Sequence, residues 1–241
     1  AFNRSGNTLT ITNTSGSPGT IFYTTDGTDP LPPDGVNTVE TILLDQGAAA
    51  SALIPSIENG GANLSLSDWA LTIAPPDPEN WLTGSSGIGF DYDGLIGLDV
   101  EAMKGDNASV FVRVPFSVAD QEPLETWNGL TLRMKFEDGF VAYINGARVA
   151  EFQAPSSLLW DSAATSYHSD SKAVNFIDFD ISAHLGELQV GSNMLAIHAL
   201  NQSVGSSDLL ALPQLVASAI SVSTPGARVY TAPLDLDASA T

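Results

Sequence analysis

The chain is 241 residues long and 43% hydrophobic, which allows one or two domains with a core of ordinary size. Its 28 acidic and 8 basic side chains give a formal net charge of −20, which argues against nucleic acid or an anionic membrane as a partner, because both require a basic surface. The absence of cysteine excludes thiol catalysis, disulfide bonds, zinc–thiolate sites and iron–sulfur clusters.

The acidic composition and the start of the chain indicate the protein's surroundings. The chain begins at Ala1 without a visible signal peptide, in the approach to a strand, so we expect a fragment of a longer protein. Dispersed carboxylates keep a protein soluble and suit hard divalent cations, which fits a secreted or cell-surface protein in calcium-containing water. An acidic domain without such ions fits the composition equally well. No run of about 18 apolar residues occurs, so we expect no membrane insertion.

The first strand signals lie near the N-terminus. Residues 8–12 alternate polar and apolar side chains with period two, as a half-buried strand does, and residues 21–24 follow as a second strand after a Ser-Gly-Ser-Pro-Gly turn. We therefore expect a small β unit over residues 1–50, with the small-residue stretch at 47–52 as a joint to the rest of the chain.

Strand signals continue through the chain, whereas helix signals are weak. Strands are predicted at residues 109–116, 130–136, 140–144, 147–150, 174–181 and 193–200. Asn145 and Gly146 predict a hairpin, because a type I′ turn needs positive φ at both central residues. Many short strands with glycine-rich turns predict an all-β fold, an antiparallel jelly-roll β-sandwich over residues 51–222. One helical turn is expected within 181–188, and an acidic linker or tail over 223–241.

A specific string in the N-terminal unit reads Phe-Tyr-Thr-Thr-Asp-Gly-Thr-Asp-Pro over residues 22–30. It resembles the hairpin of the short β domain appended to chitobiase and β-hexosaminidase enzymes. The resemblance implies a small fibronectin-like accessory unit without catalysis. We expect Asp26 and Asp29 to form the turn rather than to bind calcium, because Asp side chains bond back to the turn backbone.

A broader resemblance centres on the Asn145–Gly146 hairpin. Residues 135–149 join an acidic turn to a strand and then to the hairpin. Together with residues 80–90, the strand around Arg113, and residues 159–164 and 191–198, they resemble a galactose-binding-like jelly roll of large secreted bacterial proteins. The segment is also similar to the sugar-binding domain of family-two glycosidases and to protective-antigen-type sugar modules. The latter modules carry a pair of aspartates that chelates calcium, and this chain has Glu137 in place of the first aspartate. The resemblance implies carbohydrate binding as a class, and often a structural calcium ion.

Carbohydrate sites combine an aromatic face for the sugar ring with polar side chains for its hydroxyl groups. Loop residues that one end of the sandwich can bring together are the predicted carbohydrate-binding residues: Trp160, Tyr167, His168, Asp170, Asn201 and Trp127. The sugar would stack on Trp160 or Tyr167. Two alternatives remain open: Trp160 packs as core beside a solvated loop, and Trp127 is a buried strand anchor.

The segment Asp-Tyr-Asp-Gly at residues 91–94 offers two alternate carboxylates to one cation, without the full spacing of a calcium loop. The resemblance implies a structural calcium ion, Ca²⁺, and we predict Asp91, Asp93 and Asp208 as its ligands. The alternative is that residues 91–94 form a plain turn that binds no ion. His198 lies in an apolar strand and is predicted to be a hydrogen-bonded structural histidine.

Catalysis is not expected. The Gly-x-Ser-x-Gly elbow is absent, no string indicates a serine triad, and no two histidines have the spacing of metal ligands. We predict a non-catalytic carbohydrate-binding module of a large secreted or cell-surface protein, which binds a polysaccharide or cell-surface glycan beside neighbouring domains of the same chain. A structural or adhesive spacer is the first alternative. A polysaccharide-degrading enzyme is the second, which a pocket with two carboxylates about 5–10 Å apart would favour.

Overall fold

The computed structural model of the chain describes residues 2–5, 8–11, 36–71 and 78–222. The chain divides into two units, one of residues 1–38 with 221–241 and one of residues 39–220. In the first unit the described residues include an antiparallel hairpin of β1 (Phe2–Ser5) and β2 (Thr8–Ile11). The expected strand at 21–24, the string at 22–30 with Asp26 and Asp29, and the expected linker at 223–241 lie outside the described residues.

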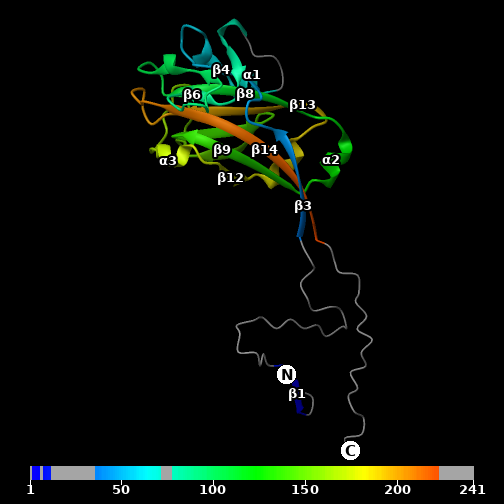
Figure 1. Cartoon of the computed structure of the whole chain (residues 1–241). Helices are drawn as coiled ribbons and strands as arrows, with labels where there is room; N and C mark the ends of the chain where they lie inside the picture. The colour runs from blue at the N-terminus through cyan, green and yellow to red at the C-terminus, as the bar shows by residue number, and fades with distance from the viewer. Residues whose placement is uncertain (1, 6–7, 12–35, 72–77, 223–241) are drawn as a thin grey trace, which may run out of the picture. The chain divides into compact units, whose positions relative to one another are not determined.

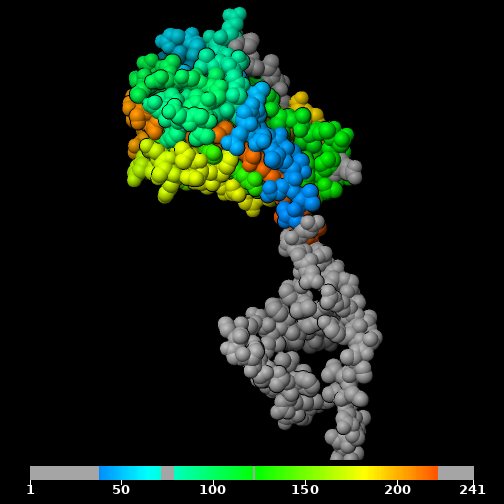
Figure 2. Space-filling model, in the orientation of Figure 1, coloured from blue at the N-terminus to red at the C-terminus, as the bar shows by residue number. Residues whose placement is uncertain are grey.

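The second unit is a sandwich of two sheets (Figure 1). The first sheet has the order β11-β10-β13-β8-β4-β5, and the second has the order β12-β9-β14-β6-β7, with β3 also paired to β14. In the space-filling view the blue β3 lies beside the orange β14 (Figure 2). The strands of the first sheet are β4 (Ala49–Leu53), β5 (Leu82–Ser85), β8 (Ser109–Val118), β10 (Gly139–Ile144), β11 (Ala147–Phe152) and β13 (Gly191–Leu200). Those of the second are β3 (Val36–Leu44), β6 (Ile88–Phe90), β7 (Leu98–Asp99), β9 (Gly129–Glu137), β12 (Ile177–Asp180) and β14 (Leu209–Val222).

Short helical segments connect the strands. They are α1 (Leu66–Trp69), α2 (Gln121–Thr126) and α3 (Asp170–Ala173), with the 3₁₀ turns η1 (Gly61–Asn63), η2 (Pro78–Asn80), η3 (Glu101–Met103) and η4 (Ser182–Glu187). The turn η4 is the helical turn that the sequence predicts. Within the described ranges, no helix is both long enough and apolar enough to cross a membrane.

The architecture confirms the prediction of an all-β, mainly antiparallel sandwich. The Asn145–Gly146 hairpin is also confirmed: the two residues have φ of 50° and 86°, and they join β10 to β11. The sequence did not predict β14, because Pro213 interrupts its apolar run and lacks the N–H of a ladder residue. The strand nevertheless pairs with β9 on both sides of Pro213. The boundary expected at residue 50 falls inside β4, which lies between β5 and β8, so residues 39–50 group with the sandwich.

The main core lies between the two sheets. Its largest fully buried side chains include Phe136 of β9 and Phe140 and Ile144 of β10. Because side chains alternate along a strand, Val110, Val112 and Val114 of β8 also belong to this core.

A second, aromatic layer covers the opposite face of the first sheet. It contains Trp69, Trp81, Phe111 and Tyr143. The helix α1, which lies over β4 and β8 (Figure 1), brings Trp69 onto Phe111, with the ring centroids 4.4 Å apart and the rings nearly parallel. Both faces of the central strands are therefore buried.

The connection that contains α1 is held at both ends by polar side chains. At its start, Ser65 and Asp68 form a capping box. After its end, the buried Arg113 of β8 donates to the carbonyl oxygens of Trp69 and Leu71 over 3.0 and 3.1 Å. These bonds fix the position of the aromatic layer relative to the strands.

The tight turn between β5 and β6 requires a glycine. Gly87 has a φ of +94°, and a Cβ at this position would collide with the carbonyl oxygen of Leu95. Gly105 has nearly the same φ, +91°, but no atom lies within 4 Å of the position that a Cβ would take.

We expect Gly105→Ala to lower the free energy of unfolding by about 1–2 kcal/mol, the cost of the left-handed backbone. Gly87→Ala should lower it by about 2 kcal/mol more, because it also adds a clash. Urea denaturation of both variants tests this, and equal losses would contradict it.

Candidate functional site

Trp160, in the connection after β11, lines two hollows in the surface and is itself half-buried. The first, which we call the polar hollow, has a volume of about 590 Å³. The second, the aromatic hollow, has a volume of about 290 Å³. Of the six residues that the sequence predicts for carbohydrate binding, Trp160 is the one that lines these two hollows.

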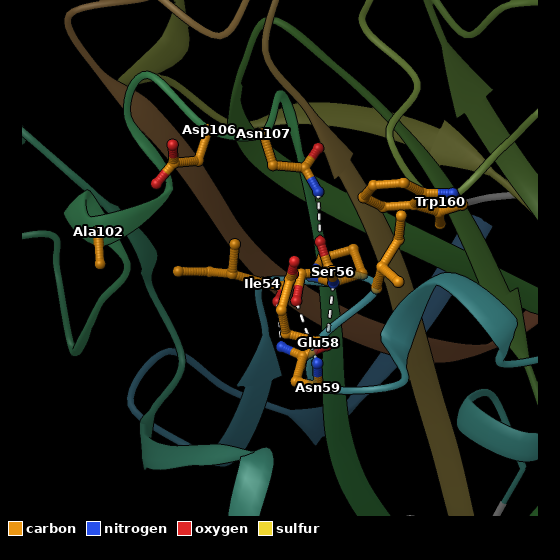
Figure 3. A pocket seen from close by; sticks show the side chains of 10 residues that line it. Ile54, Ser56, Glu58, Asn59, Ala102, Asp106, Asn107 and Trp160 are labelled. Carbon is orange, nitrogen blue, oxygen red and sulfur yellow. Dashed lines mark hydrogen bonds between the residues drawn. The ribbon is translucent and has the colours of Figure 1, made fainter.

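The polar hollow lies between the end of β4 and the start of β8. Figure 3 shows Trp160 on one side of it and Ala102 and Asp106 on the other, with Glu58 between them. The carboxylates of Glu58 and Asp106 are exposed, and no described residue donates a hydrogen bond to either. Both can therefore accept hydrogen bonds from a ligand.

Two amide side chains fix the walls of the polar hollow. Asn59 accepts hydrogen bonds from the backbone N–H groups of Ser56 and Gly61 and donates to the carbonyl of Ile54. Asn107 donates to the carbonyl of Pro55 over 2.6 Å (Figure 3). Because these amides are already bonded to backbone, they shape the hollow rather than read a ligand.

The aromatic hollow has a floor and a roof of different origin. Phe111 of β8, His198 of β13 and Tyr143 of β10 form the floor on neighbouring strands. The roof comes from two connections, and its residues are Ala62, Leu64, Leu66, Trp69, Leu158, Leu159 and Trp160. Leu159 and Leu66 are large apolar side chains that remain exposed at its edge. Carbon-rich side chains thus dominate this hollow.

His198 is hydrogen-bonded, as the sequence predicts. Its Nε2 lies 2.9 Å from Oγ of Ser109, whose hydroxyl donates to the carbonyl oxygen of Ser162 over 2.6 Å. Burial lowers the pKa of His198 to about 3, so the ring is neutral at physiological pH. Since the Ser109 proton points to Ser162, His198 Nε2 must donate to Ser109. The pair is therefore not arranged as a nucleophile and its base.

The other predicted carbohydrate-binding residues do not gather around Trp160 in these hollows. Tyr167 is 65% exposed, and Asp170 begins α3. Trp127 is only 9% exposed and packs in the main core, which matches the alternative of a buried strand anchor. The side chains of His168 and Asn201 are buried as well, so they offer little surface to a polysaccharide.

Asp138 explains why the loops around His168 and Asn201 turn inward. Its two carboxylate oxygens accept the backbone N–H groups of His168 and Gln202 over 2.7 and 2.8 Å. The His168 ring stacks on Phe136, with centroids 4.5 Å apart, and its Nδ1 lies 2.9 Å from the carbonyl oxygen of that residue. No local sequence pattern predicts the two hydrogen bonds of Asp138, because their partners lie 30 and 64 positions away in the chain.

A separate acidic cluster can hold a metal ion. Carboxylate oxygens of Glu137, Asp170 and Asp208 all lie within 4.8 Å of one another. Calcium binds oxygen at about 2.3–2.6 Å, so ligands on opposite sides of the ion are about 5 Å apart, and the observed spacing fits it. Of the predicted ligands Asp91, Asp93 and Asp208, the cluster contains only Asp208.

The position of Tyr92 explains this difference. Its side chain is buried, whereas Asp91 and Asp93 on either side are exposed. The Tyr92 hydroxyl donates to Glu137 over 2.8 Å and lies 3.2 Å from Asp208. The sequence segment therefore contributes its tyrosine to the cluster instead of its two carboxylates.

Glu137 holds its proton unusually tightly. Burial, with smaller contributions from a hydrogen bond with Asp138 and from the charges of Asp138 and Asp208, raises its pKa to about 8, although the Tyr92 hydrogen bond acts in the opposite direction. Burial also raises the pKa of Tyr92, and the hydrogen bond to Glu137 adds to the effect. Without a cation, Glu137 is therefore largely protonated at neutral pH.

The raised pKa of Glu137 makes the stability of the metal-free protein depend on pH. The ordinary value is 4.5 and the folded value about 8, so between these pH values the folded state binds more protons than the unfolded state. The stabilisation is complete below pH 4.5 and is lost as the pH rises to about 8, by on the order of 3–5 kcal/mol. Glu137→Gln keeps an oxygen for Tyr92 but cannot ionise. In chelator, urea denaturation across this window should show a flatter pH dependence for the variant; parallel curves would contradict the assignment.

No protein-family model matches the sequence, and no curated protein matches it. Among solved structures, the chain is similar to a β-glucuronidase of an uncultured Clostridium species, with 11% identity, 80% of this chain and 31% of that chain covered, and a TM-score of 0.43. It is similar to β-glucuronidase 2 of Bacteroides uniformis, with 13% identity, coverage of 75% and 18%, and a TM-score of 0.42. A glycosyl hydrolase family 2 member from Bacteroides cellulosilyticus gives 10% identity, coverage of 74% and 20%, and a TM-score of 0.39. The chain spans less than a third of the length of each.

Proposed function

We propose that this chain is a non-catalytic carbohydrate-binding module that holds a polysaccharide at Trp160. The observation that carries the proposal is the half-buried indole between two hollows of about 590 and 290 Å³. Sites for small molecules typically measure about 300–1,000 Å³ and combine apolar walls with a few polar groups. Both properties are present on the two sides of Trp160.

The chemistry of the lining suits sugar rings. The C–H face of a pyranose packs against an indole ring, and its hydroxyl groups donate to nearby acceptors. Glu58 and Asp106 supply such acceptors across the polar hollow from Trp160 (Figure 3). Hydrogen bonds to a charged acceptor are stronger than those between neutral groups, which compensates for the exposed position of the two carboxylates.

The arrangement of titratable groups supports a role without catalysis. Glycosidases place two carboxyl groups on either side of a bound glycosidic linkage. The polar hollow has two carboxylates, Glu58 and Asp106, but both are exposed, whereas the catalytic acid of a glycosidase is typically kept protonated by burial. The clustered carboxylates of Glu137, Asp170 and Asp208 line neither hollow. Glu137 is also buried, so a polysaccharide has no direct access to it.

We further propose that the acidic cluster binds Ca²⁺. Its ligands are all oxygen atoms, which calcium prefers, and they come from β9, from α3 and from the connection before β14. The ion would replace the proton of Glu137 and join these three elements. Its role would be structural, since the cluster lies apart from Trp160 and the two hollows.

We also propose that the module belongs to a secreted or cell-surface protein and adjoins further domains there. The acidic composition supports this setting, because calcium is plentiful outside cells. A structural or adhesive spacer is the alternative, and the binding experiment below separates the two.

Calcium should stabilise the protein through Asp208. When free Ca²⁺ exceeds the dissociation constant a hundredfold, we expect about 2.7 kcal/mol of added stability relative to chelator. Asp208→Asn should abolish this difference. Asp93→Asn is the matched control, because it removes a nearby exposed carboxylate outside the cluster and should leave the difference intact. Thermal unfolding in calcium and in chelator measures the effect, and an unchanged midpoint for the wild type would rule out a folding-linked ion.

Loss of the indole should weaken polysaccharide binding. Affinity electrophoresis in gels that contain a panel of neutral and acetylated polysaccharides would show retardation of the wild-type chain. Trp160→Ala should weaken that retention about tenfold or more, because it removes the stacking surface. Tyr167→Ala is the control, since it removes an exposed aromatic ring that lines neither hollow. Equal retention of Trp160→Ala and wild type would contradict the proposed site, and no retention on any polysaccharide would favour the spacer.

A further inference from the structure

A buried tyrosine whose hydroxyl has no protein partner lines the aromatic hollow. Tyr143 is only 6% exposed, yet no residue in the described ranges exchanges a hydrogen bond with its hydroxyl. The described chain has two fully buried side-chain polar atoms without a partner, Gln153 Oε1 and Asn201 Oδ1. The Tyr143 oxygen is not one of them, so it reaches accessible space. Tyr143 lines the aromatic hollow, and its hydroxyl is the polar group that this residue can offer to a ligand there.

His198 supplies the complementary group. Its Nε2 donates to Ser109, because the Ser109 hydroxyl proton is directed at the carbonyl oxygen of Ser162. In the neutral ring the other nitrogen, Nδ1, is then an acceptor without a hydrogen. Nothing in the described part of the chain donates to Nδ1. Since His198 also lines the hollow, this nitrogen provides a fixed acceptor beside the apolar roof.

The two groups are neighbours on one face of the sheet. In the pairing of β10 with β13, Tyr143 lies opposite Ala196, and Val141 lies opposite His198. Tyr143 and His198 are therefore diagonal neighbours, at a spacing of about 7–8 Å, that project from the same side. The edge contacts of both rings with Trp69, at centroid distances of 5.8 and 6.1 Å, agree with this placement. The two side chains therefore border the same hollow from one face of the sheet.

We propose that the aromatic hollow recognises the acetamido group of an N-acetylated sugar, an inference that rests on the proposed polysaccharide binding at Trp160. An acetamido group has one N–H donor, one carbonyl acceptor and one methyl group. The N–H donates to Nδ1 of His198, the carbonyl accepts from the hydroxyl of Tyr143, and the methyl packs against Leu64 and Leu158 of the roof. The hollow matches all three parts.

The same lining disfavours the two common replacements for an acetamido group. A hydroxyl at the same ring position has no methyl to bury and leaves the apolar walls unfilled. A protonated amine brings a charge into an apolar hollow that has no carboxylate among its lining residues, and burying an unpaired charge is unfavourable. The discrimination therefore follows from the chemistry of the walls as well as from Tyr143 and His198.

The proposal can be tested with three trisaccharides that share a β-1,4-linked gluco backbone and differ only in the substituent at carbon 2. They carry an acetamido group, an ammonium group or a hydroxyl group on each ring. Calorimetric titration of the full chain should give the acetylated trisaccharide about tenfold or more tighter binding than the hydroxyl form. Tyr143→Phe, which removes one oxygen, should weaken binding of the acetylated form about tenfold and leave the hydroxyl form unchanged. Tyr167→Phe is the control and should bind like the wild type.

The outcomes separate this inference from the function on which it rests. If no trisaccharide and no polysaccharide binds, both proposals fail. If polysaccharides bind at Trp160 but the acetylated and hydroxyl trisaccharides bind equally, or the ammonium form binds best, acetamido recognition is overturned and the module function stands. Tyr143→Phe with undiminished preference for the acetylated form also overturns it. Saturation-transfer NMR on the wild type gives a readout without mutation: the acetyl methyl protons should receive the strongest saturation, and a weak methyl signal contradicts the proposal.

Discussion

The stacking of Trp69 on Phe111 covers a sheet face that would otherwise meet water. Alternation along β8 directs its valines to the main core and Phe111 to this outer face, so both faces of the strand need a covering layer. Arg113 holds the cover in place through the carbonyl oxygens of Trp69 and Leu71. The cover is incomplete between Trp69 and Trp160, and the aromatic hollow is the space that remains. The candidate site thus arises from the way one sheet face is closed.

Local sequence patterns were sufficient for the sandwich and insufficient for the orientation of its loops. The Asn145–Gly146 turn needs only the two residues that form it, and the regular alternation of the hairpin strands predicts their type. The burial of His168 depends instead on Asp138, 30 positions away, and on the ring of Phe136. Trp160 was predicted because a tryptophan in a polar loop is itself a signal, and the structure places it beside the two hollows. That Tyr143 and His198 lie on one face of the sheet follows from strand register, which the sequence does not reveal.

The acidic cluster is a second feature that local sequence patterns did not predict in full. Its three carboxylates come from positions 137, 170 and 208, so no short motif contains them. Asp208 was predicted as a ligand together with Asp91 and Asp93, the two carboxylates on either side of Tyr92. In the turn after β6 the side chain of Tyr92 is buried and those of Asp91 and Asp93 are exposed, which separates the two carboxylates from the cluster. Burial of Glu137 raises its pKa to about 8, so a cation bound by the cluster would have to displace this proton.

The divided origin of the aromatic hollow has an evolutionary consequence. Its floor belongs to strands whose other face builds the core, so substitutions there are constrained by folding. Its roof comes from two connections outside the strands, which tolerate insertion and replacement far better. Sequence changes can therefore alter the lining of the hollow through its two roof segments, whereas a change in the floor would also disturb the sheet beneath it.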